Sequence, residues 1–113
     1  MRKLAAASAA ILFAFGPVTA VAAERIYVIR HLQKDTGADP VLSAEGAANA
    51  AKLSDLLPAE KVTAIFATPT RRAMQTGEPL AQRLGLKVTP YDPRDNAALA
   101  AAVAQTKGAV LVI

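Results

Sequence analysis

Apolar runs alternate with stretches of helical periodicity, and this alternation constrains the fold more than any other feature of the chain. The apolar runs lie at 25–30, 62–67, 87–89 and 109–113. The helical patterns lie between them, at 44–57, 71–84 and 96–105. Such alternation is typical of parallel strands joined by helical crossovers, with helices on both faces of the sheet. The sequence therefore predicts an α/β domain with three layers, α/β/α, and a mostly parallel sheet.

Capping and breaking residues predict where two of the helices begin and end. Ser43 is placed to cap the first helix, and Pro58 ends it. Thr70 is placed to cap the second, and Gly85 suits the position after its last residue. Pro79 falls inside the second pattern, and a proline inside a helix removes a backbone hydrogen bond. We therefore expect a kink or a break near residues 77–78.

The first 23 residues have the pattern of a secretory signal peptide. A basic start at Met1–Lys3 precedes an apolar run from Leu4 to Phe15, and small residues suited to cleavage follow at 20–23. An uncleaved N-terminal anchor is the alternative. Cleavage would leave one domain, residues 24–113, with no stable membrane anchor. The expected location is secreted or periplasmic.

Composition excludes several classes of function. The whole chain has a net charge of +4, but Arg2 and Lys3 belong to the predicted signal peptide, and no basic stripe interleaved with aromatic residues follows. Nucleic acid is therefore not an expected partner. The chain has no cysteine and one histidine, and its carboxylates do not cluster. Neither a disulfide framework nor a dedicated metal site is expected.

Basic residues follow the first two predicted strands. Arg30 and His31 end the first, and Arg71 and Arg72 come shortly after the second, where a helix begins. The carboxyl ends of parallel strands open on one side of a sheet, so both pairs are expected at one crevice. Guanidinium groups and a helix N-terminus bind phosphate, and an imidazole can act as a nucleophile. The residues alone leave open whether His31 is catalytic or structural, and whether Arg71 or Arg72 binds the anion.

Three segments resemble motifs of the histidine phosphatase superfamily, the phosphoglycerate-mutase-like proteins. Ile26–His31 resembles the family's opening Arg-His motif, and Leu42–Gly46 resembles its Leu-Ser/Thr-x-x-Gly segment. Ala67–Thr76 resembles the Ser-x-x-x-Arg-Ala-x-Gln-Thr segment. The motifs keep the family's order, and the resemblance covers about residues 25–113. In style it is closest to short phosphohistidine-phosphatase-like members.

The resemblance implies a phosphatase that works through a phosphohistidine, and the predicted signal peptide makes this an exported phosphatase. His31 matches the histidine that becomes phosphorylated, and Arg30 and Arg72 match the arginines that bind the phosphoryl group. The implied reaction is hydrolysis of a phosphomonoester or a phosphoramidate, with no metal or organic cofactor. The implied partner is a small phosphorylated substrate or a phosphoprotein.

The chain departs from the family pattern in three ways. Leu32 replaces the usual glycine after the Arg-His pair. No glutamate follows the third strand as a proton donor, and the acids there, Asp92 and Asp95, suit a turn and a helix cap. The family's second catalytic histidine, expected after the last strand, is missing, so the resemblance implies a fold truncated after the fourth strand. A non-catalytic phosphate-binding module and an inactive fragment are the alternatives. Near the expected pocket, Thr68 and Thr70 suit turn and cap positions.

Overall fold

The computed structural model describes residues 22–57 and 61–113. The predicted signal peptide lies almost entirely outside the described residues, as does Pro58. No helix in the described part of the chain has the length and apolar character needed to cross a membrane.

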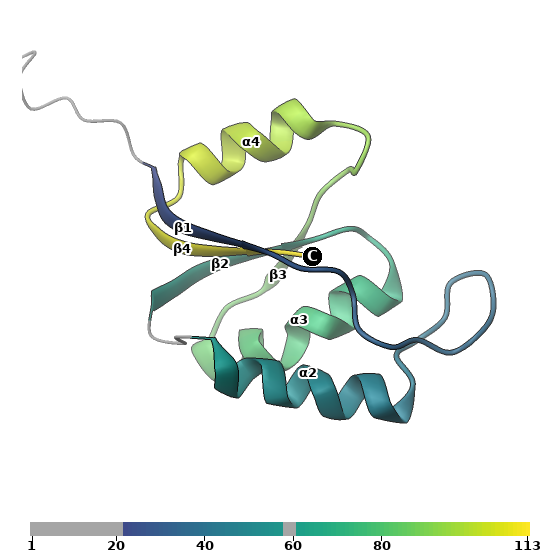
Figure 1. Cartoon of the computed structure of the whole chain (residues 1–113). Coiled ribbons are helices and arrows are strands. Elements are labelled where there is room, and N and C mark those ends of the chain that lie inside the picture. Colours follow the sequence, from purple (N-terminus) through teal and green to yellow (C-terminus); the bar gives the residue numbers. More distant parts are fainter. Residues whose placement is uncertain (1–21, 58–60) are drawn as a thin grey trace, which may run out of the picture.

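Four strands and three helices form the domain, in the predicted order. They are β1 (Ala23–Val28), α2 (Ala44–Leu56), β2 (Val62–Ala67), α3 (Arg71–Leu84), β3 (Val88–Pro90), α4 (Asn96–Ala104) and β4 (Gly108–Val112). The strands form one parallel sheet in the order β1-β4-β2-β3. Helix α4 covers one face of the sheet, and α2 and α3 cover the other (Figure 1). The predicted three-layer α/β fold is therefore confirmed.

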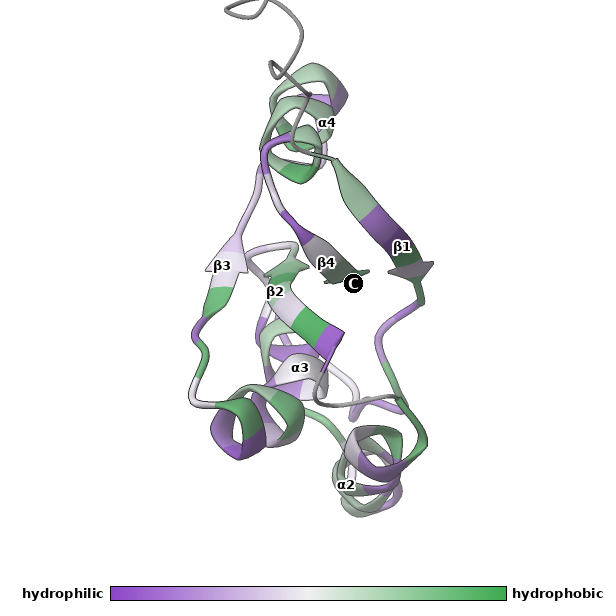
Figure 2. Cartoon of the chain, turned by 90° about the vertical axis from the view of Figure 1, so that its left-hand side faces the viewer, coloured by the Kyte–Doolittle hydropathy of each residue, from purple (hydrophilic) through white to green (hydrophobic). Residues whose placement is uncertain are grey.

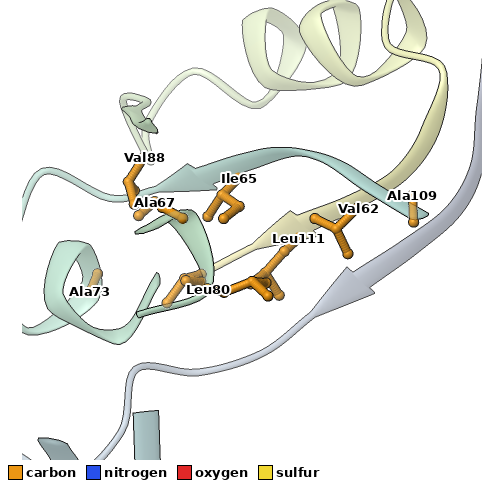
Figure 3. Packing of buried hydrophobic residues seen from close by; sticks show 10 residues of the cluster. Val62, Ile65, Ala67, Ala73, Leu80, Val88, Ala109 and Leu111 are labelled. Atoms are coloured by element: carbon orange, nitrogen blue, oxygen red, sulfur yellow. The ribbon is translucent and has the colours of Figure 1, made fainter. Parts of the chain in front are cut away.

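The core lies on both faces of the central strands. Successive side chains of a strand point to opposite faces. Ile65 and Leu111 therefore pack with Leu80 of α3 (Figure 3), whereas Phe66 and Val110 pack on the face that α4 covers. Because β4 lies between β1 and β2, none of residues 109–113 is more than 7% exposed. Burial on both faces explains why this run is continuously apolar in the sequence.

Strand β1 lies at the edge of the sheet, and two of its apolar side chains are exposed. Ile26 is 53% exposed and Val28 is 73% exposed. These two side chains, with Leu99 and Val103 of α4, line an apolar hollow of about 530 Å³. The ribbon of α4 is mostly green in Figure 2, which marks its hydrophobic residues.

The helix ends follow the predicted capping residues. The Ser43 hydroxyl accepts a hydrogen bond from the Gly46 amide at 3.1 Å, and Thr70 accepts one from Ala73 at 3.3 Å. Gly85 has a φ of 69°, in the left-handed region that glycine adopts without steric cost. These caps fix the start of α2, after the segment that carries Arg30 and His31, and the start of α3, whose first turn carries Arg72.

Two expectations need correction. Helix α3 continues from Arg71 to Leu84 through Pro79, so of the expected kink or break near residues 77–78 the structure excludes the break. The next two residues, Leu80 and Ala81, are fully buried, and their packing against the sheet compensates for the missing backbone hydrogen bond. Strand β1 begins and ends two residues earlier than the predicted range 25–30, because it pairs with β4 from Ala23 to Val28. Arg30 and His31 therefore follow the strand and do not end it.

Candidate active site

The carboxyl ends of β1, β4 and β2 lie side by side. The Ile29 amide donates to the Val112 carbonyl at 2.9 Å, and the Thr68 amide donates to the Ile113 carbonyl at 3.0 Å. The Ile113 amide in turn donates to Phe66 of β2 at 2.8 Å. The segments that follow β1 and β2 therefore leave the sheet at the same edge, as expected from the parallel topology.

His31 lies half-buried just beyond β1. Its Nδ1 lies 2.8 Å from the Leu32 carbonyl oxygen. A carbonyl oxygen can only accept, so Nδ1 carries the proton, and Nε2 of the neutral ring carries the lone pair. Arg30, which is exposed, and His31 line a hollow of about 330 Å³ that residues 30–34 form. The ring therefore has one nitrogen fixed by the backbone and one nitrogen suited to attack.

The adjacent arginines Arg71 and Arg72 have different surroundings. Arg71 is exposed, and both its amide and its Nε donate to Asp39, each at 3.0 Å. Arg72 is half-buried, and its buried Nε has no hydrogen-bond partner in the described part of the chain. An unpaired buried donor is costly, and one on a charged group more so. Arg71 therefore holds the loop that contains Asp39, whereas the buried Nε of Arg72 has no comparable partner in the residues that the structure describes.

The acids after β3 are both engaged in local structure. Asp92 accepts hydrogen bonds from the Arg94 Nε at 3.1 Å and from the Arg94 amide at 2.9 Å, and these bonds lower the pKa of Asp92 below its ordinary value of 3.8. Asp95 caps α4 by accepting from the Ala98 amide at 3.0 Å. The expected turn and cap roles are confirmed. At neutral pH Asp92 is ionised, so it is a poor proton donor.

Thr68 and Thr70, near the site, have the turn and cap roles expected from the sequence. Thr70 is the N-cap of α3, and the Thr68 and Thr70 hydroxyl oxygens lie 3.4 Å apart in the turn that leads into this helix. Their hydroxyls are therefore used by the turn and cap.

Leu32 fits the loop without the freedom of glycine. The residues with positive φ in the described part of the chain are all glycines, so Leu32 keeps an ordinary backbone conformation. Its departure from the family pattern therefore needs no strained backbone at this position.

Sequence reasoning assigned no role to Gln75 and Thr76, which connect α3 to the loop after β1. The Leu32 amide donates to the Thr76 hydroxyl at 3.0 Å, and the Leu42 amide donates to Oε1 of Gln75 at 2.8 Å. The sequence signals were the Gln-Thr pair that ends the family-like segment Ala67–Thr76 and the spacing of four between Arg72 and Thr76, which places both on one side of a helix. Their partners in the loop lie far away in the sequence, so no local pattern indicates them.

Comparison with known families decides the assignment. The model of the histidine phosphatase superfamily (branch 1) matches residues 26–95, a range that includes Arg30, His31 and Arg72. The chain belongs to the histidine phosphatase superfamily. Membership in this family supports a phosphatase function for the chain. In the described residues, no group of three or more His, Cys, Asp or Glu side chains is placed to hold a metal ion.

A solved structure has a similar fold. The chain is similar to SixA from Agrobacterium tumefaciens, which is assigned as a phosphohistidine phosphatase. The two chains are 23% identical with a TM-score of 0.60, and the match covers 78% of this chain and 67% of that one. No curated protein matches the chain. The likeness to SixA shows that this histidine phosphatase has the phosphoglycerate-mutase-like fold.

Proposed function

We propose that the chain is the phosphatase domain of an exported enzyme that hydrolyses phosphoramidates, with phosphohistidine on a protein as the main substrate class. The observation that carries this proposal is the hydrogen bond from His31 Nδ1 to the Leu32 carbonyl, which leaves Nε2 as the nucleophile. Arg30 and Arg72 bind the phosphoryl group, and the unpaired Nε of Arg72 supports this role.

The proposed reaction proceeds through two displacements at phosphorus. The Nε2 lone pair of His31 attacks phosphorus, and the P–N bond of the substrate breaks. Water then attacks the phosphorylated His31, the new P–N bond breaks, and inorganic phosphate is released. The Nδ1 proton, held on the Leu32 carbonyl, stays on the ring throughout, so His31 leaves phosphorus as a neutral imidazole. The arginines stabilise the charge on the transferring oxygens.

The engagement of Asp92 and Asp95 in local hydrogen bonds favours a phosphoramidate over a phosphomonoester. An alkoxide leaving group needs a proton from the enzyme, whereas a phosphohistidine that has taken a proton from water on its second ring nitrogen leaves as a neutral imidazole. Asp92 is ionised beside Arg94, and Asp95 caps α4, so neither supplies that proton. The assignment of the similar SixA chain points to the same substrate class.

Export is part of the proposal. The basic start, the apolar run and the small residues at 20–23 support a signal peptide that delivers the domain to the periplasm or the medium.

The direct test is transfer of labelled phosphate to the protein from a phosphohistidine-containing protein. We expect acid-labile label on the parent chain, release of inorganic phosphate with time, and no label on His31→Ala. Label that persists in His31→Ala overturns the assignment of the nucleophile. Phosphate binding without label or turnover instead supports the alternative of a non-catalytic module.

The adjacent arginines provide a matched pair of variants. Arg72→Gln removes the charged donor and is expected to weaken vanadate binding on the order of 10- to 100-fold, the range for a lost charged hydrogen bond. Arg71→Gln is the control, because the Arg71 guanidinium is occupied by Asp39. Equal loss of vanadate affinity in both variants would contradict the proposed role of Arg72.

A further inference from the structure

We infer that Thr76 is a positioning residue that fixes the His31 imidazole relative to Arg72; this inference rests on the function proposed above. Thr76 lies on α3, one turn after Arg72, and is 0% exposed. A threonine inside a helix gains nothing from helix propensity. Its hydroxyl must therefore be explained by the groups that it binds.

The Thr76 hydroxyl bridges the two segments that carry the candidate site. Its Oγ1 donates to the Arg72 carbonyl at 2.8 Å, within the helix. The same oxygen accepts from the Leu32 amide at 3.0 Å, across 44 residues of sequence. One hydroxyl thus ties the backbone of the phosphate-binding arginine to the peptide bond between His31 and Leu32.

The bridge continues to the reacting ring through a single residue. The Leu32 amide is held by Thr76, and the Leu32 carbonyl accepts the Nδ1 proton of His31 at 2.8 Å. The next carbonyl, that of Gln33, accepts from the Ser43 amide at 2.9 Å. The Leu32–Gln33 segment is therefore held by α3 through the Leu32 amide and by the start of α2 through the Gln33 carbonyl. Loss of the Thr76 hydroxyl would free the first of these attachments and, with it, the carbonyl that selects the tautomer of His31.

The single histidine of the chain makes this inference measurable without any turnover. Nitrogen NMR of the imidazole reports the tautomer of one ring and no other. We expect the Nδ1–H form in the parent and in Thr76→Ser, which keeps a hydroxyl. Thr76→Val has the same shape without the hydroxyl. In this variant we expect the His31 ring to shift toward the mixture of Nδ1–H and Nε2–H tautomers that a free imidazole has.

Kinetics provides the second readout. Thr76→Val is expected to slow phosphorylation of His31 about tenfold, as for one lost hydrogen bond, and to leave KM nearly unchanged because the Arg72 side chain is intact. Thr76→Ser is expected to restore most of the rate. A fall in affinity with an unchanged rate would contradict a positioning role.

Thr106 offers a matched control. Its hydroxyl donates to the Ala102 carbonyl at 2.8 Å, the same local bond that Thr76 makes to Arg72, near the end of α4. Thr106→Val should leave both the His31 tautomer and the phosphorylation rate unchanged. An equal effect in Thr106→Val would show that the response is one of general stability.

The outcomes separate this inference from the proposed function. A tautomer shift in Thr76→Val, with no phosphatase activity in the parent, supports the role of Thr76 and rejects the proposed function. An unchanged tautomer in Thr76→Val overturns the inference whether or not the parent is active. If Thr76→Val does not fold, hydrogen exchange in the parent decides. The Leu32 amide lies outside the helices and strands, so its protection from exchange depends on the hydrogen bond to the Thr76 hydroxyl. Exchange as fast as that of an exposed amide would therefore overturn the inference.

Discussion

Gly46→Ala tests the contact between α2 and the loop that carries His31. Gly46 is buried in the first turn of α2, and a Cβ there would lie 2.0 Å from the Gln33 carbonyl oxygen and 2.9 Å from its carbon. That oxygen accepts from both the amide and the hydroxyl of Ser43, so it cannot move away without loss of hydrogen bonds. The clash is with backbone atoms, and no change of side-chain rotamer relieves it.

Two effects of this substitution have opposite signs. Alanine in place of glycine favours a helix by about 1 kcal/mol, whereas overpacking typically costs about 1–3 kcal/mol. Because the obstacle is a hydrogen-bonded peptide, we take the upper end of the overpacking range. The expected net loss is about 2 kcal/mol of unfolding free energy, or a fall in Tm of roughly 8–16 °C for a domain of this size.

Urea denaturation of the parent and the variant measures this difference, with an unchanged m-value as the check that unfolding remains two-state. Ala48→Gly, at an exposed position of the same helix, isolates the propensity effect and should cost about 1 kcal/mol. A Gly46→Ala variant as stable as the parent, or more stable, would refute the close approach of α2 to Gln33.

Three further predictions concern the core, a helix cap and an exposed ion pair. Leu80→Ala empties a fully buried position and should cost about 2–5 kcal/mol in urea denaturation; a loss below about 1 kcal/mol would contradict its place in the core. Asp95→Ala removes the cap of α4 and should cost about 1 kcal/mol, whereas Asp95→Asn should cost less. Arg94 lowers the pKa of Asp92, so this pair stabilises the fold above about pH 3.8 and the effect disappears as pH falls through the lowered pKa. Arg94→Ala should therefore lower Tm slightly at pH 6, and the difference should shrink as the pH falls below about 3.8. A difference that grows at low pH would contradict this sign.

Local chemistry predicted those parts of the fold that depend on neighbouring residues. The bounds of β2 and the caps at Ser43, Thr70 and Gly85 follow from side chains within a few positions. The continuity of α3 through Pro79 did not follow, because it depends on packing of the next turn against strands distant in the sequence. The start of β1 depends on the partner strand in the same way.

In the candidate site too, features set by neighbouring residues could be predicted, and features set by residues distant in the sequence could not. The residue types and the strand ends predicted where Arg30 and His31 lie, but the residues alone did not distinguish Arg71 from Arg72. The structure separates their surroundings through Asp39, which lies 32 positions before Arg71 in the chain. The hydrogen bond between the Leu32 amide and the Thr76 hydroxyl joins residues 44 positions apart, and no periodicity in the sequence indicates it.

The position of β4 has a consequence for the order in which the domain assembles. The strand that leads to His31 and the strand that leads to α3 do not touch in the sheet; β4 lies between them and pairs with both. Val28 has no strand partner until Val112, its partner in β4, has been made. Pairings this distant in sequence form late, because their loop-closure entropy is large. During synthesis, β2, β3 and α3 can associate first, while β1, the strand that leads to His31, stays unpaired until residues 108–112 are made.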